Sequence, residues 1–266
     1  MNQQLVIDIP FSDNLKISSR SKKYVTCLQM VHKVLSREIS ENISLEQFNH
    51  LGIVAGFIDQ HLDQLSIDEQ RILLLHYDRL FDKLWDVNHY LIFRNEICEF
   101  VEQHQFVFNC EGIHLKDLFL FLQHCKSLAI KDDIQSFGRS IINIAIQKQE
   151  ATKSNALIDL LRLEGEAVIG LLKALLYKEH NNSKSFKPTL NLLRRLEHIL
   201  NVADDTLDIN ADRKKNIINP NVSALHRLNM IRHLVGQIAG TIISFPIKTA
   251  YYGPRLTWYY FSKTLR

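Results

Sequence analysis

Apolar residues recur at helical spacing along most of this chain. Between Lys22 and Glu38 they fall three or four residues apart, which is the period of one helix face. The same period predicts further helices over residues 44–64, 66–84, 88–108, 113–130, 132–149, 154–177, 189–213 and 223–243. Residues 1–20 show no sustained period and predict an irregular lead-in.

Several of these helices have recognisable ends. Ser44-Leu-Glu-Gln47 and Ser66-Ile-Asp-Glu69 are capping-box sequences, which mark the first turn of a helix. The polar run His180–Lys187, followed by Pro188, predicts a loop between two long helices. Breaks are also predicted at 109–112 and 216–221, and prolines 246 and 254 interrupt the C-terminal segment.

Composition supports a helical fold. Nine glycines and five prolines make up about 5% of the chain, against roughly 12% in average usage. Turns between strands need these residues, so the composition excludes collagen-like and disordered chains and disfavours sandwiches and doubly wound sheets. No repeat or long linker divides the sequence. We therefore predict one all-α domain over residues 21–266, a bundle of about eight to ten helices.

Charge and cysteine content narrow the class of protein. The net charge of +3 is too balanced to indicate nucleic-acid binding, and a helix-turn-helix reading is disfavoured because aspartates would repel the phosphate backbone. The four cysteines show neither metal-site spacing nor CxxC pairing, which is typical of reduced cytoplasmic thiols. No signal peptide is visible, and the most apolar window, 234–246, is too short to span a bilayer. We expect a soluble, cytoplasmic protein whose aromatic, basic segment Tyr251–Arg266 could contact a membrane surface.

The spacing of aspartates is the most informative feature. Sixteen aspartates would form about one Asp-x-x-x-Asp pair by chance. The chain has five such pairs, at 59/63, 78/82, 82/86, 204/208 and 208/212. Each pair places two carboxylates on one helix face, where they repel unless a cation or a basic group lies between them.

The strongest cluster lies on the predicted helix 189–213. One polar stripe about 80° wide contains Glu197, Asn201, Asp204, Asp208 and Asp212. An apolar stripe runs beside it, so the acids border the core. Three carboxylates over two turns can bind Mg²⁺, and Arg213, Lys214 and Lys215 could neutralise a phosphate at the same place. A solvated helix end of mixed charge is the alternative that the residues leave open.

A second cluster, Asp59 and Asp63, lies one to two turns after Gly52, Ala55 and Gly56 on the same predicted face. Small residues there leave room for a ligand, or else for close packing of two helices. Taken together, the two clusters suggest acidic helix faces aimed across one cavity. The two remaining Asp-x-x-x-Asp pairs share Asp78, Asp82 and Asp86. These aspartates alternate with Arg79 and Lys83 and predict a charged exposed face.

These residues resemble the class I isoprenoid synthase superfamily, which includes terpene cyclases and squalene/phytoene synthases. Asp204, Asp208 and Asp212 look like the downstream metal motif, and Arg213 looks like a diphosphate sensor. Asp59-Gln-His-Leu-Asp63 resembles the first aspartate-rich motif, as it stands in bacterial large terpene synthases. The segment Leu163–Leu171 is similar to a small-residue helix of squalene/phytoene synthases.

The resemblance implies a class I synthase-like bundle that ionises an allylic prenyl diphosphate. Asp59, Asp63, Asp204, Asp208 and Asp212 would hold Mg²⁺, and the basic run 213–215 would bind the diphosphate. Aromatic rings that could face the carbocation are Phe57, Trp85, Phe119, Phe121 and Tyr251. The alternative function is a non-catalytic helical scaffold or degenerate relative, whose acids face solvent and whose C-terminal segment docks a partner or a membrane.

Overall fold

The computed structural model describes residues 19–39, 45–106, 114–180, 183–214, 224–252 and 254. Within these ranges the chain is helical and contains no strand, which confirms the predicted all-α class. The helices are α1 (Ser19–Ile39), α2 (Leu45–Leu62), α3 (Ile67–Asp86), α4 (Tyr90–Gln103), α5 (His114–Leu128), α6 (Lys131–Glu150), α7 (Ser154–His180), α8 (Phe186–Lys214) and α9 (Ala224–Ser244). A short helical segment, Pro246–Tyr252, follows α9 after a bend of 118°. Residues 1–18 of the predicted lead-in lie outside the described residues.

The helix boundaries follow the local chemistry of the sequence. At the start of α3, the backbone N–H of Glu69 donates to Ser66 Oγ at 3.3 Å, and the backbone N–H of Ser66 donates to Glu69 Oε2 at 2.7 Å. This confirms the predicted capping box; the one at Ser44 lies outside the described residues. The predicted loop 180–187 is shorter than expected, because α8 begins at Phe186 and takes Pro188 into its first turn. Proline is tolerated there because first-turn N–H groups have no acceptor within the helix.

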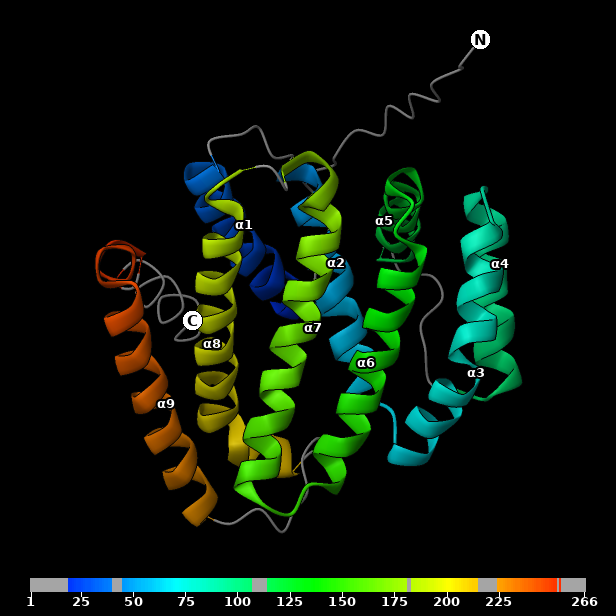
Figure 1. Cartoon of the computed structure of the whole chain (residues 1–266). Coiled ribbons are helices and arrows are strands. Elements are labelled where there is room, and N and C mark those ends of the chain that lie inside the picture. Colours follow the sequence, from blue (N-terminus) through cyan, green and yellow to red (C-terminus); the bar gives the residue numbers. More distant parts are fainter. Residues whose placement is uncertain are drawn as a thin grey trace.

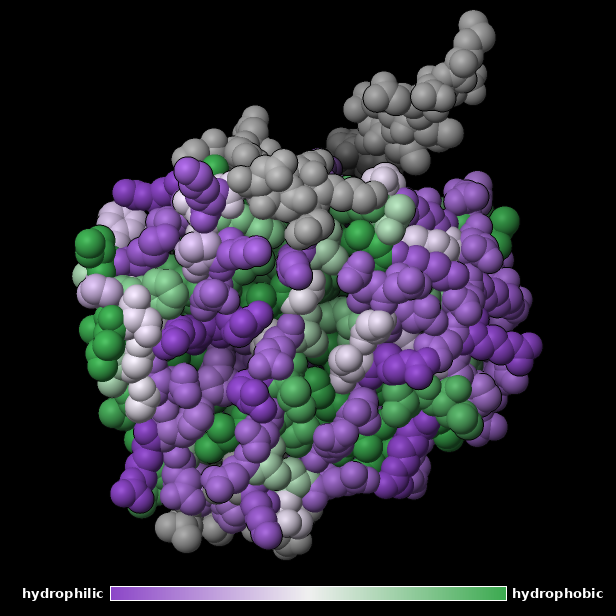
Figure 2. All heavy atoms as spheres, in the orientation of Figure 1, coloured by the Kyte–Doolittle hydropathy of each residue, from purple (hydrophilic) through white to green (hydrophobic). Residues whose placement is uncertain are grey.

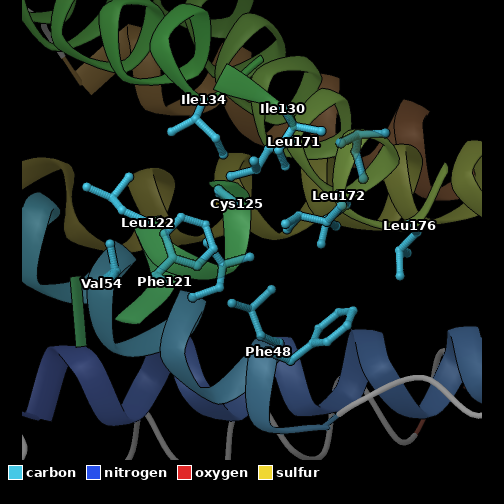
Figure 3. Close-up of a cluster of buried hydrophobic side chains, with 14 of the residues drawn as sticks. Phe48, Val54, Phe121, Leu122, Cys125, Ile130, Ile134, Leu171, Leu172 and Leu176 are labelled. Atoms are coloured by element: carbon cyan, nitrogen blue, oxygen red, sulfur yellow. The ribbon is translucent and has the colours of Figure 1, made fainter. Parts of the chain in front are cut away.

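The helices pack as a layered bundle around a continuous apolar core. In Figure 1, α6, α7 and α8 lie side by side at the front, α1 and α2 lie behind them, and α9 and the α3–α4 pair form opposite edges. The main core draws buried residues from α1 to α8. Figure 3 shows the part of it where Phe48 and Val54 of α2 meet Phe121 and Cys125 of α5 and Leu172 of α7.

Two glycines allow α1 and α2 to approach closely. A Cβ added at Gly52 would lie 2.5 Å from the Cα of Val25, and one at Gly56 would lie 2.5 Å from the Cα of Ser21. These distances are shorter than any real Cβ contact, so the α1 backbone fills the space beside both glycines. The small residues before Asp59 therefore serve helix packing, and the ligand space considered from the sequence is not there.

The end of α2 is fixed by a buried side chain of α3. Gln70 is 1% exposed, and its amide Nε2 donates to the backbone oxygen of Leu62 at 2.8 Å and to that of Leu65 at 3.4 Å. The Leu62 oxygen also accepts from the backbone N–H of Leu65 at 3.3 Å, so the Gln70 amide adds a second donor at the end of α2. These bonds hold the turn that carries Asp63 directly beyond α2.

Candidate functional site

A buried lysine joins acidic residues from three other helices. The Nζ of Lys148, on α6, donates to Glu164 Oε2 of α7 at 2.7 Å and lies 4.0 Å from Asp205 Oδ2 of α8. The Lys148 side chain is only 14% exposed. Asp59 of α2 acts on the same ammonium through its charge. Four helices thus converge on one ion-paired group.

The charges around Lys148 decide its protonation state. Burial lowers the pKa of Lys148, because the ammonium loses its hydration. The negative charges of Glu164, Asp205 and Asp59, with the hydrogen bond to Glu164, outweigh this and raise the pKa well above its ordinary value. Lys148 is therefore protonated at every physiological pH.

Glu197 of α8 stands in the same polar region but in a different state. Burial, followed by the charge of Glu164, raises the pKa of Glu197 to about 8, although Asn201 and Lys148 act in the opposite direction. Asn201 Nδ2 donates to Glu197 Oε1 at 2.6 Å, whereas Oε2 is buried without a hydrogen-bond partner among the described residues. Glu197 is thus largely protonated at pH 7.

A glycine makes room for this carboxyl group. A Cβ at Gly165 of α7 would overlap Glu197 Oε2, so a larger residue there would require the Glu197 carboxyl group to move. Gly165 directly follows Glu164, which places one turn of α7 against both the lysine and the protonated acid. We use the name Lys148 cluster for the set Asp59, Lys148, Glu164, Glu197, Asn201 and Asp205.

The structure brings together part of the predicted site. Asp59 joins the Lys148 cluster, and Asp63 lies half-buried in the turn after α2. The polar stripe of α8 does border the bundle interior at Glu197 and Asn201. The side chains of Asp204, Asp208, Asp212, Arg213 and Lys214 lie outside what the structure describes, as does all of Lys215. Their predicted roles stay predictions.

Sequence reasoning named three members of the Lys148 cluster, Asp59, Glu197 and Asn201, and missed the roles of Lys148, Glu164 and Asp205. Lys148 stands in an unremarkable polar run near the end of α6, and only the fold places it among acids of α2, α7 and α8. Asp205 lies just beside the predicted stripe. The signal for a buried polar group on α8 was the stripe of Glu197 and Asn201, which borders an apolar face.

The described residues do not form a recognisable metal-binding site. Within the ranges that the structure covers, no three His, Cys, Asp or Glu side chains are arranged to hold a metal ion. The potential metal ligands of the Lys148 cluster are nonetheless carboxylate and amide oxygens, the type of ligand that Mg²⁺ prefers. Lys148 supplies the positive charge among them.

The other acidic pairs and the cysteines behave as structural features. Asp78 pairs with Arg139 and accepts from Gln135 Nε2 at 3.0 Å, and Asp82 lies 2.9 Å from Lys131 Nζ. These are exposed pairs on the α3–α6 surface, as predicted for a charged face. Cys27, Cys98 and Cys125 form no disulfide with one another, and burial raises the pKa of Cys125 to about 12. Cys110 lies outside the described residues.

Comparisons with known protein families, curated proteins and solved structures find no match for this chain.

Proposed function

We propose that this protein is a Mg²⁺-dependent class I isoprenoid synthase. It would ionise an allylic prenyl diphosphate and release diphosphate, in either a cyclisation or a coupling of prenyl chains. One observation carries the proposal: acids of α2 and α8, the helices that bear the two aspartate motifs, act on the same buried lysine. The two motif-bearing helices therefore reach one polar region inside the bundle.

The proposed roles follow from charge. Asp59 and Asp63 of the first motif, with Asp204, Asp208 and Asp212 of the second, would hold the metal. Arg213, Lys214 and Lys215 would bind diphosphate oxygens. Bound Mg²⁺ would supply the charge that stabilises the leaving diphosphate as the C–O bond breaks. Lys148 would hold neighbouring carboxylates in place through its fixed positive charge.

The main apolar core contains aromatic rings that could face a hydrocarbon chain. Phe57 of α2 is 5% exposed and belongs to the main apolar core, as do Phe119 and Phe121 of α5. An apolar, water-poor neighbourhood favours a carbocation over its capture by water. Tyr251 is a poorer candidate for this role, because its ring already faces the Arg37 guanidinium at 4.0 Å.

Release of inorganic diphosphate from geranyl, farnesyl and geranylgeranyl diphosphate tests the proposal. With Mg²⁺ present the wild type should release diphosphate, and Asp208→Ala or Asp59→Ala should lower the rate by about 100-fold. Asp82→Ala, which removes an exposed acid of α3, is the matched control and should keep the rate. No release from the wild type, or unchanged release from Asp208→Ala, would refute the proposal.

A non-catalytic helical scaffold is the second candidate function. The observation that favours it is Lys148 itself, whose ammonium already neutralises part of the charge that a metal would neutralise. Thermal unfolding with Mg²⁺ and inorganic diphosphate separates the two candidates. A synthase should unfold at a higher temperature with both present, and Asp208→Ala should not. A scaffold should show no change in either protein.

Replacement of Lys148 provides a second test that distinguishes the two candidate functions. Lys148→Met leaves several carboxylates facing one another, so we expect a loss of about 3–5 kcal/mol of stability. Lys131→Met removes an exposed partner of Asp82 and should leave the stability nearly unchanged. If the acids of the cluster can bind Mg²⁺, millimolar MgCl₂ should restore part of the stability of Lys148→Met and leave Lys131→Met unchanged.

A further inference from the structure

Helix α9 presents an apolar face to solvent. Five of its hydrophobic side chains, spaced alternately by three and four residues, are 40–60% exposed. We call them the α9 outer face: Leu228, Ile231, Val235, Ile238 and Ile242. Ile243 and Ile247 extend it and are 80% and 84% exposed. In Figure 2, hydrophobic residues follow the left edge of the molecule, where Figure 1 places α9.

The opposite face of α9 packs on the bundle through Met230 and Leu234 and through several polar groups. Met230 and Thr241 are fully buried. His233 Nε2 lies 2.9 Å from His198 Nε2 of α8, and Arg195 donates to the backbone oxygen of Gly240 at 3.2 Å. The usual arrangement of a surface helix, apolar side inward and polar side outward, is thus partly reversed. An exposed apolar row of this length marks an interaction surface.

The sequence around this face carries one sign of charge. Residues 213–266 contain nine Lys and Arg and no Asp or Glu, a net charge of +9. The whole chain has a net charge of +3, so the first 212 residues sum to −6. Arg227 and Arg232 flank the α9 outer face and are exposed. An apolar row beside basic residues, without acids, complements a surface of anionic lipid headgroups.

We propose that the α9 outer face docks this protein onto the interface of an anionic lipid bilayer. The apolar row would enter the boundary between headgroups and acyl chains, about 5–10 Å deep, while the two arginines reach back to lipid phosphates. Among the described residues no single helix is long and apolar enough to cross a membrane. The pair His226–Ser244 and Pro246–Tyr252 has that length and composition together, but it bends by 118° and α9 stays packed on α8. The geometry therefore fits a helix that lies along the surface.

Charge favours lipid over a second copy of the chain. In a symmetric dimer the same patch meets itself, so Arg227 and Arg232 of each copy would lie near a partner face that also lacks acids. Helix α9 itself supplies no carboxylate to pair with these arginines. Anionic lipids provide that partner at every point along the helix.

Co-sedimentation of the full chain with vesicles tests the inference. We expect binding to vesicles of phosphatidylcholine with 30% phosphatidylglycerol, and at least about tenfold less binding to phosphatidylcholine alone. The triple variant Val235→Ser, Ile238→Ser, Ile242→Ser should lower the binding to anionic vesicles by about tenfold or more. Its matched control, Leu75→Ser with Leu91→Ser, changes exposed leucines of α3 and α4 and should bind as the wild type does.

Three results would overturn the inference. They are no binding to anionic vesicles, equal binding by the triple variant, and a wild-type dimer that only the triple variant dissociates. If the triple variant does not fold by circular dichroism, Arg227→Gln with Arg232→Gln replaces it, and unchanged binding by this pair contradicts the proposal. Vesicle binding needs no catalysis, so these results do not depend on the proposed reaction.

Discussion

At the scale of single residues, the Lys148 cluster combines two opposite responses to burial. Lys148 keeps its charge because carboxylates surround it, whereas Glu197 gives up its charge because burial and Glu164 both oppose ionisation. The protonation of Glu197 depends on the charge of Glu164, the same acid that pairs with Lys148. An ionised Glu197 would place a further negative charge beside Glu164 in a buried environment.

This difference predicts how stability changes with pH. The pKa of Glu197 is about 8 in the folded protein and near 4.5 when unfolded, so the folded state holds the proton more tightly between these values. The contribution of Glu197 to stability is thus complete below pH 4.5 and is lost as pH rises through 8. Glu197→Gln stays neutral, and its stability relative to wild type should increase by about 2 kcal/mol or more from pH 5 to pH 8.

Urea unfolding at each pH measures this difference. Glu166→Gln, which changes an exposed acid of α7, is the control and should show no such increase. A parallel pH profile for Glu197→Gln and wild type would mean that Glu197 is ionised in the folded protein.

At the scale of elements, the α1–α2 pair is the contact that depends most on residue size. Gly52 and Gly56 are one helical turn apart, and each faces the backbone of α1. Backbone atoms cannot rotate away as a side chain can, so an added methyl group must separate the helices.

We therefore expect Gly56→Ala to destabilise the protein by about 1–3 kcal/mol, despite the higher helix propensity of alanine. Gly170→Ala on α7 is the matched control, because a Cβ there meets no atom within 4 Å. It should be neutral or stabilise by up to about 1 kcal/mol. Chemical denaturation measures both, and equal effects at the two sites would show that α1 is not held against Gly56.

At the scale of the whole molecule, polar contacts join segments about 210 residues apart. Glu38 near the end of α1 pairs with Lys248 and accepts from Tyr252 Oη at 3.0 Å. Burial raises the pKa of Glu38, but these bonds and the charges of Lys248 and Arg37 outweigh it and lower the pKa overall. The segment after α9 is thereby fixed to the start of the bundle.

Loss of the Glu38 charge should weaken the attachment of residues 246–252 to α1. Glu38→Gln is expected to speed amide hydrogen exchange in residues 246–252 and to cost about 1–3 kcal/mol at pH 7. Since the folded pKa is lowered, the contribution of Glu38 is present above about pH 4.5 and disappears as pH falls through the folded value. The difference from wild type should therefore shrink in acid. Glu99→Gln, at an exposed position of α4, should show neither effect.

Much of the fold could be predicted because helix signals are local. Apolar spacing, few breakers and the Ser66 capping box depend on residues within one or two turns, and α3, α6, α7 and α9 lie where these signals placed them. The predicted start of α8 was wrong by a few residues. The first turn of a helix accepts a proline, whereas the sequence pattern placed Pro188 before the helix.

The sequence by itself determined the helical class, the acidic faces of α2 and α8, and the acid-free C-terminal region, since each is a property of spacing or composition. Only the tertiary structure decided what those faces meet. It placed the α1 backbone beside Gly52 and Gly56, set Lys148 between Asp59, Glu164 and Asp205, and turned the apolar row of α9 outward. The reason is physical: helix formation depends on near neighbours, whereas the charge state of a buried group depends on residues that only packing brings together.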